Sequence, residues 1–263
     1  MGVPDGAFYV ADGASYEPSE LTRGPWDPDS QHAGPPCAVL GGEMDRAGGI
    51  TGARVARIAF EILRPVPIAP LSVSARVVRP GRSVELVEGT LAQGDTEILR
   101  ARAWRVRTEA LELDGPRPDE QPMQGPDAAA PRDFFATGHD VGYHSAMEVR
   151  FVAGAYVEPG PARAWMRQRV PLVKGRETSP LERLLVAADS GNGVSAPLDY
   201  RRFIFINTDL SVALRRLPEG EWVGLDAVSH VEPDGIGLTD TTLHDERSPL
   251  GRATQSLLVA TRG

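Results

Sequence analysis

Apolar and polar side chains alternate along several long segments of the chain. In residues 56–63, Ile58, Phe60 and Ile62 alternate with charged or small residues. The same alternation continues in residues 71–78, 83–93 and 97–107, and it returns in residues 203–218, 221–233, 235–246 and 251–262. A period of two is typical of antiparallel strands that bury one face. The pattern therefore predicts two runs of half-buried strands, one in each half of the chain.

A short helical pattern precedes each run of strands. In the second half, Ser179 and Glu182 form a capping box, and Pro180 takes the first helical position. The apolar positions that share one helical face are Cys37, Leu40, Gly41 and Met44 in the first half, and Leu181, Leu184, Leu185 and Ala188 in the second. The sequence predicts one helix near residues 36–47 and another near residues 179–189.

Residues 111–133 interrupt both patterns. Five prolines fall there among Asp, Gly and Glu, with few apolar residues between them. Proline blocks both helical and ladder hydrogen bonds, so the segment is predicted to be a linker on the surface. The order of helix and strands is the same on both sides, which indicates an internal duplication. We therefore predict an α+β fold of the double-hotdog type, two fused units that each wrap a long antiparallel sheet around a central helix. The N-terminal unit is expected at 1–110, the linker at 111–140 and the C-terminal unit at 141–263.

The composition is that of a globular protein with an acidic surface. The chain has 263 residues, of which 41% are hydrophobic, and its formal net charge is -8. Because duplex-binding domains usually carry a basic face, we expect no nucleic-acid partner. Cys37 is the only cysteine, the first residues do not resemble a signal peptide, and no apolar run is long enough to span a bilayer. These features favour a cytoplasmic protein.

Three polar positions of the second half carry a resemblance to a known family. Ala188-Asp189 ends the predicted helix, Thr208-Asp209 lies in the following strand, and Thr254-Gln255 lies near the C-terminus. This order is similar to acyl-CoA thioesterase II and its relatives, which have Ala-(Ser/Ala)-Asp, Thr-x-Asp or Thr-Asp, and Thr-x-Gln or Thr-Gln at these places. The similarity runs over most of residues 24–262. It implies that Asp189, Thr208 and Gln255 activate a water that cuts an acyl-CoA into a fatty acid and CoA, with no cofactor. It also implies association into homo-oligomers.

The position of Asp189 supports this chemistry independently of the family. It continues the apolar face of the helix and lies in the last turn, where the helix dipole disfavours a negative charge. Burial and the helix end should both raise its pKa toward that of a useful base. Thr208 shares strand parity with Leu210 and Val212, and Gln255 with Leu257 and Val259. We therefore expect both polar side chains on the buried face, within reach of Asp189.

Structural roles are the alternatives for these residues. Asp189 could cap the turn that follows it, and Thr208 and Gln255 could satisfy local backbone groups. The first half has Arg57 and Arg105 near the corresponding places, so we expect one active site per chain. A catalytically silent protein that binds acyl-CoA or an acyl carrier is the main alternative function. A hotdog hydratase ranks last, because it would need an Asp and His pair in the active-site helix segment and no histidine follows Asp189 there.

Other candidate functional residues have weaker support in the sequence. His139 and His144 lack a third metal-ligand pattern, so no metal is expected. His32 could contact a substrate or line a turn. Arg201-Arg202 and Arg215-Arg216 could meet CoA phosphates or form a solvated strand edge. Cys37 is expected to be core packing.

Overall fold

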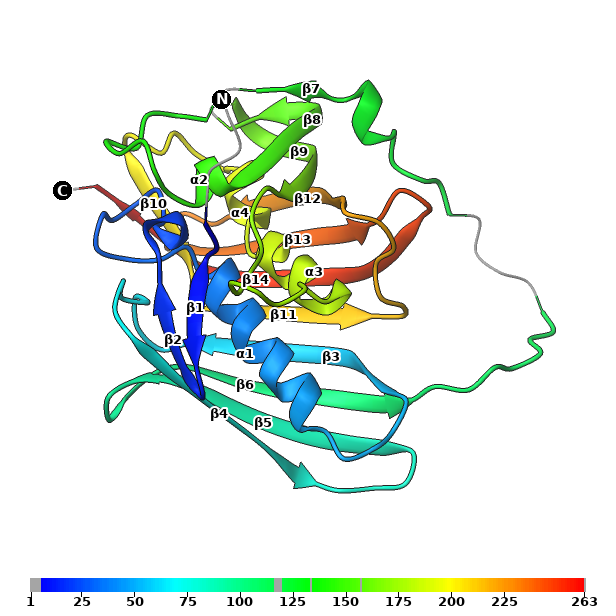
Figure 1. Cartoon of the computed structure of the whole chain (residues 1–263). Helices are drawn as coiled ribbons and strands as arrows, with labels where there is room; N and C mark the ends of the chain where they lie inside the picture. The colour runs from blue at the N-terminus through cyan, green and yellow to red at the C-terminus, as the bar shows by residue number, and fades with distance from the viewer. Residues whose placement is uncertain (1–5, 116–119, 133, 157, 263) are drawn as a thin grey trace.

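The computed structural model describes residues 6–115, 120–132, 134–156 and 158–262 (Figure 1). Strands of these residues form one 14-stranded antiparallel sheet, in the order β1-β2-β4-β5-β6-β3-β11-β14-β13-β12-β9-β8-β7, with β10 beside β14. The strands are β1 (Tyr9–Asp12), β2 (Ser15–Pro18), β3 (Ala53–Ile62), β4 (Leu71–Arg79), β5 (Val84–Gln93), β6 (Thr96–Arg107), β7 (Ala130–Pro131), β8 (Met147–Ala155), β9 (Glu158–Gln168), β10 (Phe203–Asn207), β11 (Asp209–Leu214), β12 (Val223–Val231), β13 (Ile236–His244) and β14 (Pro249–Thr261). The helices are α1 (Gly34–Ala47), α2 (Tyr143–Ala146), α3 (Pro180–Ala188) and α4 (Gly191–Val194), with 3-10 turns at η1 (Glu20–Thr22) and η2 (Pro126–Ala128).

The two halves of the molecule share this sheet. β3 of the first half pairs with β11 of the second, so that Ile58 lies opposite Val212 and Phe60 opposite Leu210. Figure 1 shows α1 and α3 side by side, with the strands of the first half around α1 and those of the second half around α3. The predicted double-hotdog fold, with one central helix in each half, is confirmed.

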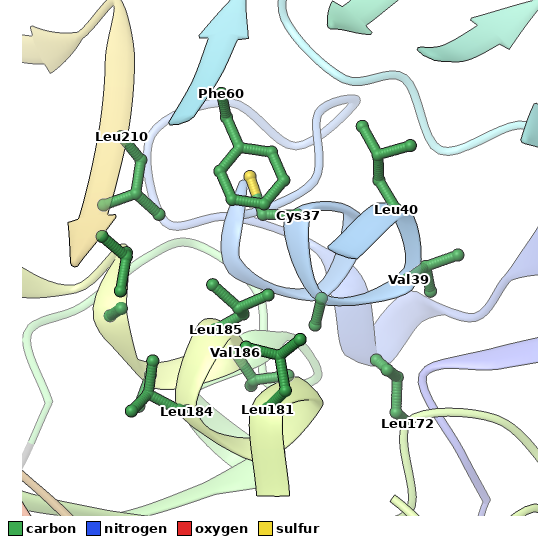
Figure 2. Close-up of a cluster of buried hydrophobic side chains, with 14 of the residues drawn as sticks. Cys37, Val39, Leu40, Phe60, Leu172, Leu181, Leu184, Leu185, Val186 and Leu210 are labelled. Atoms are coloured by element: carbon green, nitrogen blue, oxygen red, sulfur yellow. The ribbon is translucent and has the colours of Figure 1, made fainter. Parts of the chain in front are cut away.

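The core is centred on the contact between α1 and α3. Leu185 of α3 is fully buried, and its side chain lies so close to Gly41 of α1 that a Cβ at Gly41 would overlap it. Figure 2 shows Leu185 in one cluster with Cys37 of α1, Phe60 of β3 and Leu210 of β11. Cys37 is core packing, as expected. This contact fixes where the two helix ends lie, and therefore positions the site described below.

The structure departs from the predicted pattern in three places. β8 and β9 lie before α3, and no strand was predicted there; their alternation is weakened by glycine, proline and charged residues. Part of the linker segment is packed, since Met123 is buried against Trp165 and Trp222. The predicted strand at 203–218 is broken at Thr208 into β10 and β11. Within the described ranges, no helix is both long and apolar enough to span a membrane.

The end of α1 in the first half is built around a buried ion pair. Arg105 of β6 is 7% exposed and forms ion pairs with Glu85 and, at 2.9 Å, with Asp45. Glu85 accepts hydrogen bonds from the backbone N–H groups of Gly49 and Ile50, just after α1. Arg105 was expected near the place that corresponds to Gln255 in the second half. A charged network therefore occupies this end of the helix in the first half.

Replacing Arg105 with alanine should destabilise the protein by about 3–5 kcal/mol, because the Glu85 carboxylate would remain buried without its partner. Arg102 on the same strand is a matched control, since its side chain is 63% exposed in its pair with Glu88. Arg102→Ala should cost at most about 1 kcal/mol. Urea unfolding of the two variants measures both values, and equal losses would contradict a special role for the buried pair.

Candidate active site

Asp189 lies where two helix ends meet. It is the C-cap residue of α3, and only 4% of it is exposed. Gly34, the first residue of α1, lies so close to the backbone carbonyl of Val186 that a Cβ at this position would clash with it. A glycine is therefore needed for the start of α1 to reach the end of α3. The carboxylate of Asp189 consequently faces the positive end of α1 and belongs to the negative end of α3.

A cavity of about 400 Å³ opens beside this junction. Both halves contribute to its wall, and several aromatic rings line it. Lining residues include Trp26, His32, Ile62, Phe134, Phe135, Tyr143, Tyr156, Asp189, Asn192, Asn207 and Thr208. The aromatic rings contact each other, with Phe134 and Phe135 stacked at 4.4 Å and Trp26 and Phe135 at 5.3 Å between centroids. The cavity is thus an apolar pocket with a few convergent polar groups, the usual form of a small-molecule site.

Three side chains from different segments contact the Asp189 carboxylate. Asn207 Nδ2 donates to Oδ1 at 2.9 Å. Gln255 Nε2 donates to the backbone carbonyl of Asp189 at 3.0 Å and lies 3.4 Å from Oδ1. His32 Nδ1 lies 3.3 Å from Oδ2. The carboxylate is therefore held from β10, from β14 and from the loop that precedes α1.

Burial sets the protonation of this cluster. It raises the pKa of Asp189 to about 7, although hydrogen bonds from Asn207, from the backbone N–H groups of Gly34 and Ala33, and from Gln255 lower it. Burial also lowers the pKa of His32 to about 3. At neutral pH the imidazole is therefore uncharged, and its contact with Asp189 is not an ion pair. The expected rise in the pKa of Asp189 has burial as its main cause.

The expectation that Thr208 points to the buried face is wrong. Thr208 is exposed, and its hydroxyl lies 3.5 Å from the backbone carbonyl of Ser256, the nearest hydrogen-bond partner. The reason is the break between β10 and β11, which shifts the alternation by one residue at this position. Phe205 is buried before the break and Leu210 after it, so Asn207 takes the inward place before Thr208. Thr208 nevertheless lines the cavity.

Gln255 is buried as expected, but its amide is occupied by the backbone. Its Oε1 accepts the N–H of Asn192 at 3.1 Å, and its Nε2 donates to the carbonyl of Asp189. It thereby ties the end of α3 to the start of α4. Gln255 is not among the residues that line the cavity. The structure thus brings Gln255 against Asp189 and leaves Thr208 at the cavity wall.

Comparisons with known proteins agree with this architecture. A family profile described as the acyl-CoA thioesterase C-terminal domain matches residues 118–259, and one described as the acyl-CoA thioesterase N-terminal domain matches residues 22–106. The chain belongs to the acyl-CoA thioesterase family. The family supports the hydrolysis of acyl thioesters as the general reaction of this thioesterase. No curated protein matches this chain.

Solved structures share the fold over almost the whole chain. A presumed thioesterase II from Thermobifida fusca YX is 19% identical, with a TM-score of 0.76 over 96% of this chain and 95% of that one. A hot dog protein of unknown function from Alicyclobacillus acidocaldarius is 14% identical, with a TM-score of 0.70 over 97% and 96%. The acyl-CoA thioesterase II TesB2 of Mycobacterium marinum is 15% identical, with a TM-score of 0.66 over 97% and 94%. At these identities the likeness establishes the fold alone.

The sequence did not indicate Asn207 as a residue of the thioesterase cavity, and it left His32 between a substrate contact and a turn. A stricter use of the spacing could have found Asn207. If Asp209 is the aspartate of the Thr-x-Asp motif, the first motif position is residue 207 and not residue 208. The contact of His32 with Asp189 was not expected, because His32 comes from the opposite half and has no spacing signal relative to Asp189. Among the described residues, no group of three or more His, Cys, Asp or Glu side chains could hold a metal ion.

The opposite pKa shifts of Asp189 and His32 predict a measurable dependence of stability on pH. Asp189 keeps its proton in the folded state up to about pH 7, whereas the unfolded chain loses it near pH 4, so its contribution to stability falls as the pH rises between these values. His32 has the reverse effect below about pH 6.5, because the unfolded chain gains a proton that the folded chain excludes.

The two effects oppose each other in the wild type, and Asp189→Asn separates them. The variant should gain unfolding free energy relative to the wild type as the pH rises from about 4 to 7, and the gain should level off above pH 7. Urea unfolding at a series of pH values measures this difference. Parallel curves for the two proteins would show that Asp189 has an ordinary pKa.

Proposed function

We propose that this thioesterase hydrolyses acyl-CoA to a free fatty acid and CoA, with Asp189 as the general base. The observation that carries the proposal is a buried carboxylate, with a pKa raised to about 7, in the wall of an apolar cavity. A general base works best when its pKa lies near the working pH. An aspartate with an ordinary pKa would be a weaker base by about three orders of magnitude in proton affinity.

The reaction needs no covalent intermediate. Water attacks the thioester carbonyl carbon while Asp189 accepts one of its protons, which gives a tetrahedral oxyanion. The C–S bond then breaks, the sulfur leaves as a thiolate, and the proton held by Asp189 returns to it or to solvent. The products are a carboxylic acid and a thiol, so atoms and charge balance without a cofactor.

We assign distinct tasks to the residues around the base. Asn207 and Gln255 donate to Asp189 and so fix its orientation. Asn207 occupies the inward place that strand parity predicted for Thr208. Thr208 stands at the cavity wall, where its hydroxyl can contact the substrate or the water. In this proposal, Gln255 acts through Asp189 rather than on the water.

Arginines near the cavity that form no ion pair within the described residues support CoA as the thiol part of the substrate. Arg64 lines the cavity, and Arg262 lies over the ring of Trp26, 5.8 Å from its centroid. Arg201 lies over the ring of Tyr200, which packs against Phe135. Among the described residues, none of these three arginines has an ion-pair partner, although the protein as a whole is acidic. Cations without an ion-pair partner close to the cavity suit the phosphates of CoA.

The turnover of acyl-CoA by site variants tests the assignment of the base. Asp189→Asn should lower kcat by about 10²–10⁴-fold with little change in KM, because the base is lost while the acyl and CoA contacts remain. Asn207→Ala should cost more than Thr208→Ala, because only Asn207 bonds the carboxylate. The rate of thiol release from short-, medium- and long-chain acyl-CoA measures each variant.

The same panel separates the alternatives. A wild-type protein that binds acyl-CoA but releases no thiol would be the silent binding protein. An enoyl-CoA belongs in the panel, because His32 and Asp189 are 3.3 Å apart and supply the Asp–His pair that the hydratase alternative requires. Loss of the enoyl double bond without thiol release would identify a hydratase. Near wild-type activity of Asp189→Asn would show that another group is the base.

We also propose that the protein forms homo-oligomers in a reducing cytoplasm, where the buried thiol of Cys37 stays reduced. Support for association comes from an exposed apolar stripe across β10, β14 and β13, in which Leu258 lies opposite both Ile206 and Ile236. Each of these three side chains is at least 43% exposed. Contiguous exposed apolar surface of this kind marks an interaction site.

Replacing Leu258 with glutamate should lower the mass that light scattering measures, because a charge would be buried in the interface. Leu113→Glu is a control, since Leu113 is 67% exposed and lies outside the sheet. A wild-type protein that is already a monomer would contradict the proposal.

A further inference from the structure

The proposed hydrolysis needs a hydrogen-bond donor for the oxyanion that forms at the thioester carbonyl. Most polar hydrogens near Asp189 are already in use. Both amide hydrogens of Asn207 are donated, one to Asp189 and one to the backbone carbonyl of Asp209. The Nε2 group of Gln255 is held by Asp189. The hydroxyl of Tyr143 donates to the carbonyl of Val186 at 2.8 Å. These groups orient the site and leave little to offer a substrate.

His32 differs from them, because within the described residues only its Nδ1 nitrogen contacts protein groups. The backbone N–H of Gly34 donates to His32 Nδ1 at 3.1 Å. In the tautomer that accepts this bond the proton lies on Nε2, and the Asp189 carboxyl, whose Oδ2 is 3.3 Å from Nδ1, can donate to the same nitrogen when it holds its proton. Within the described residues, Nε2 has no hydrogen-bond partner, and the atom is not fully buried, so it is accessible. The ring itself lines the cavity.

The ring is also held rigidly in place. It stacks on Tyr143 with 3.7 Å between centroids and an angle of 6° between planes. Tyr143 in turn is fixed by Val186 and by Ser190, next to Asp189. The backbone N–H of His32 donates to the carbonyl of Thr22 at 2.8 Å. Donors that are fixed before the reaction stabilise developing charge most effectively, because they need no reorganisation.

The imidazole remains neutral under working conditions. Burial lowers its pKa to about 3, so it does not gain a second proton near pH 7. It also lies next to the positive end of α1, which disfavours an imidazolium. A neutral imidazole beside a helix N-terminus can polarise a carbonyl without neutralising the nearby carboxylate base.

We propose that His32 is a catalytic residue whose Nε2–H donates a hydrogen bond to the thioester carbonyl oxygen and stabilises the oxyanion. This inference rests on the proposed function. The first half of the chain thereby supplies the electrophile and the second half supplies the base, Asp189. Another donor at the cavity is the second Nδ2 hydrogen of Asn192, whose first one goes to the carbonyl of Phe205. Its amide can support the same oxyanion from the α4 side.

Three substitutions of His32 separate the donor from its structural contacts. His32→Asn keeps an acceptor near Gly34 but does not reach the position of Nε2. His32→Phe keeps a ring stacked on Tyr143 and removes both nitrogens. His32→Gln can place an amide N–H near the position of Nε2. His230→Asn, at an exposed position on β12, is the control.

The Asn and Phe variants should lose about 10²–10³-fold in kcat, as expected for one oxyanion donor, with KM changed by less than about threefold. The Gln variant should recover part of the loss, and His230→Asn should match the wild type. The proposal is overturned if a folded Asn or Phe variant keeps kcat within about threefold of the wild type while Asp189→Asn is inactive. That result would leave the proposed function intact.

A direct measurement does not depend on turnover. The infrared C=O stretch of acetyl-CoA bound to Asp189→Asn should lie at a lower frequency than that of acetyl-CoA bound to Asp189→Asn/His32→Phe, because a donated hydrogen bond weakens the carbonyl bond. Equal frequencies would overturn the proposal. If the wild type releases no thiol from any acyl-CoA, the proposed function fails, and the infrared comparison still decides whether His32 contacts the carbonyl.

Discussion

A carboxylate that is kept out of water is the constraint around which this molecule is arranged. Asp189 ends α3, and burial alone would make its charged form very unfavourable. The fold offsets this with donors from three directions, namely the start of α1, Asn207 on β10 and Gln255 on β14. The balance leaves the pKa near 7 rather than far above it. A group that changes charge near neutral pH is what proton transfer from water needs.

The duplication of the hotdog unit explains why such a site is possible. Asp189 lies between the negative end of one helix and the positive end of another, so the site needs two helices. Because α1 and α3 pack through Gly41 and Leu185, the start of one helix comes against the end of the other, and Gly34 permits their close approach. Continuous pairing of β3 with β11 then holds the two halves in one register.

The two halves use buried charge differently. At the end of α1, Glu85 is neutralised by Arg105 and binds two backbone N–H groups of the following loop. At the end of α3, Gln255 binds a backbone N–H as a neutral amide, and within the described residues Asp189 pairs with no Lys or Arg, only with the neutral His32. The first arrangement is a charge-paired structural element, and the second keeps a carboxylate available. This difference in charge supports a single active site per chain.

The sequence by itself determined the alternating strands, both central helices with the capping box at Ser179, and the buried position of Asp189 at a helix end, because these depend on local periodicity and on helix ends. It also placed Gln255 on the buried face. It misplaced Thr208, because strand parity holds only while a strand is unbroken, and the break between β10 and β11 turns Asn207 inward instead. Only the tertiary structure brought His32 to Asp189, since that contact joins residues 157 positions apart through packing of α1 on α3. Periodicity reports which face of an element is buried, whereas the partner that it meets there is set by how the elements pack.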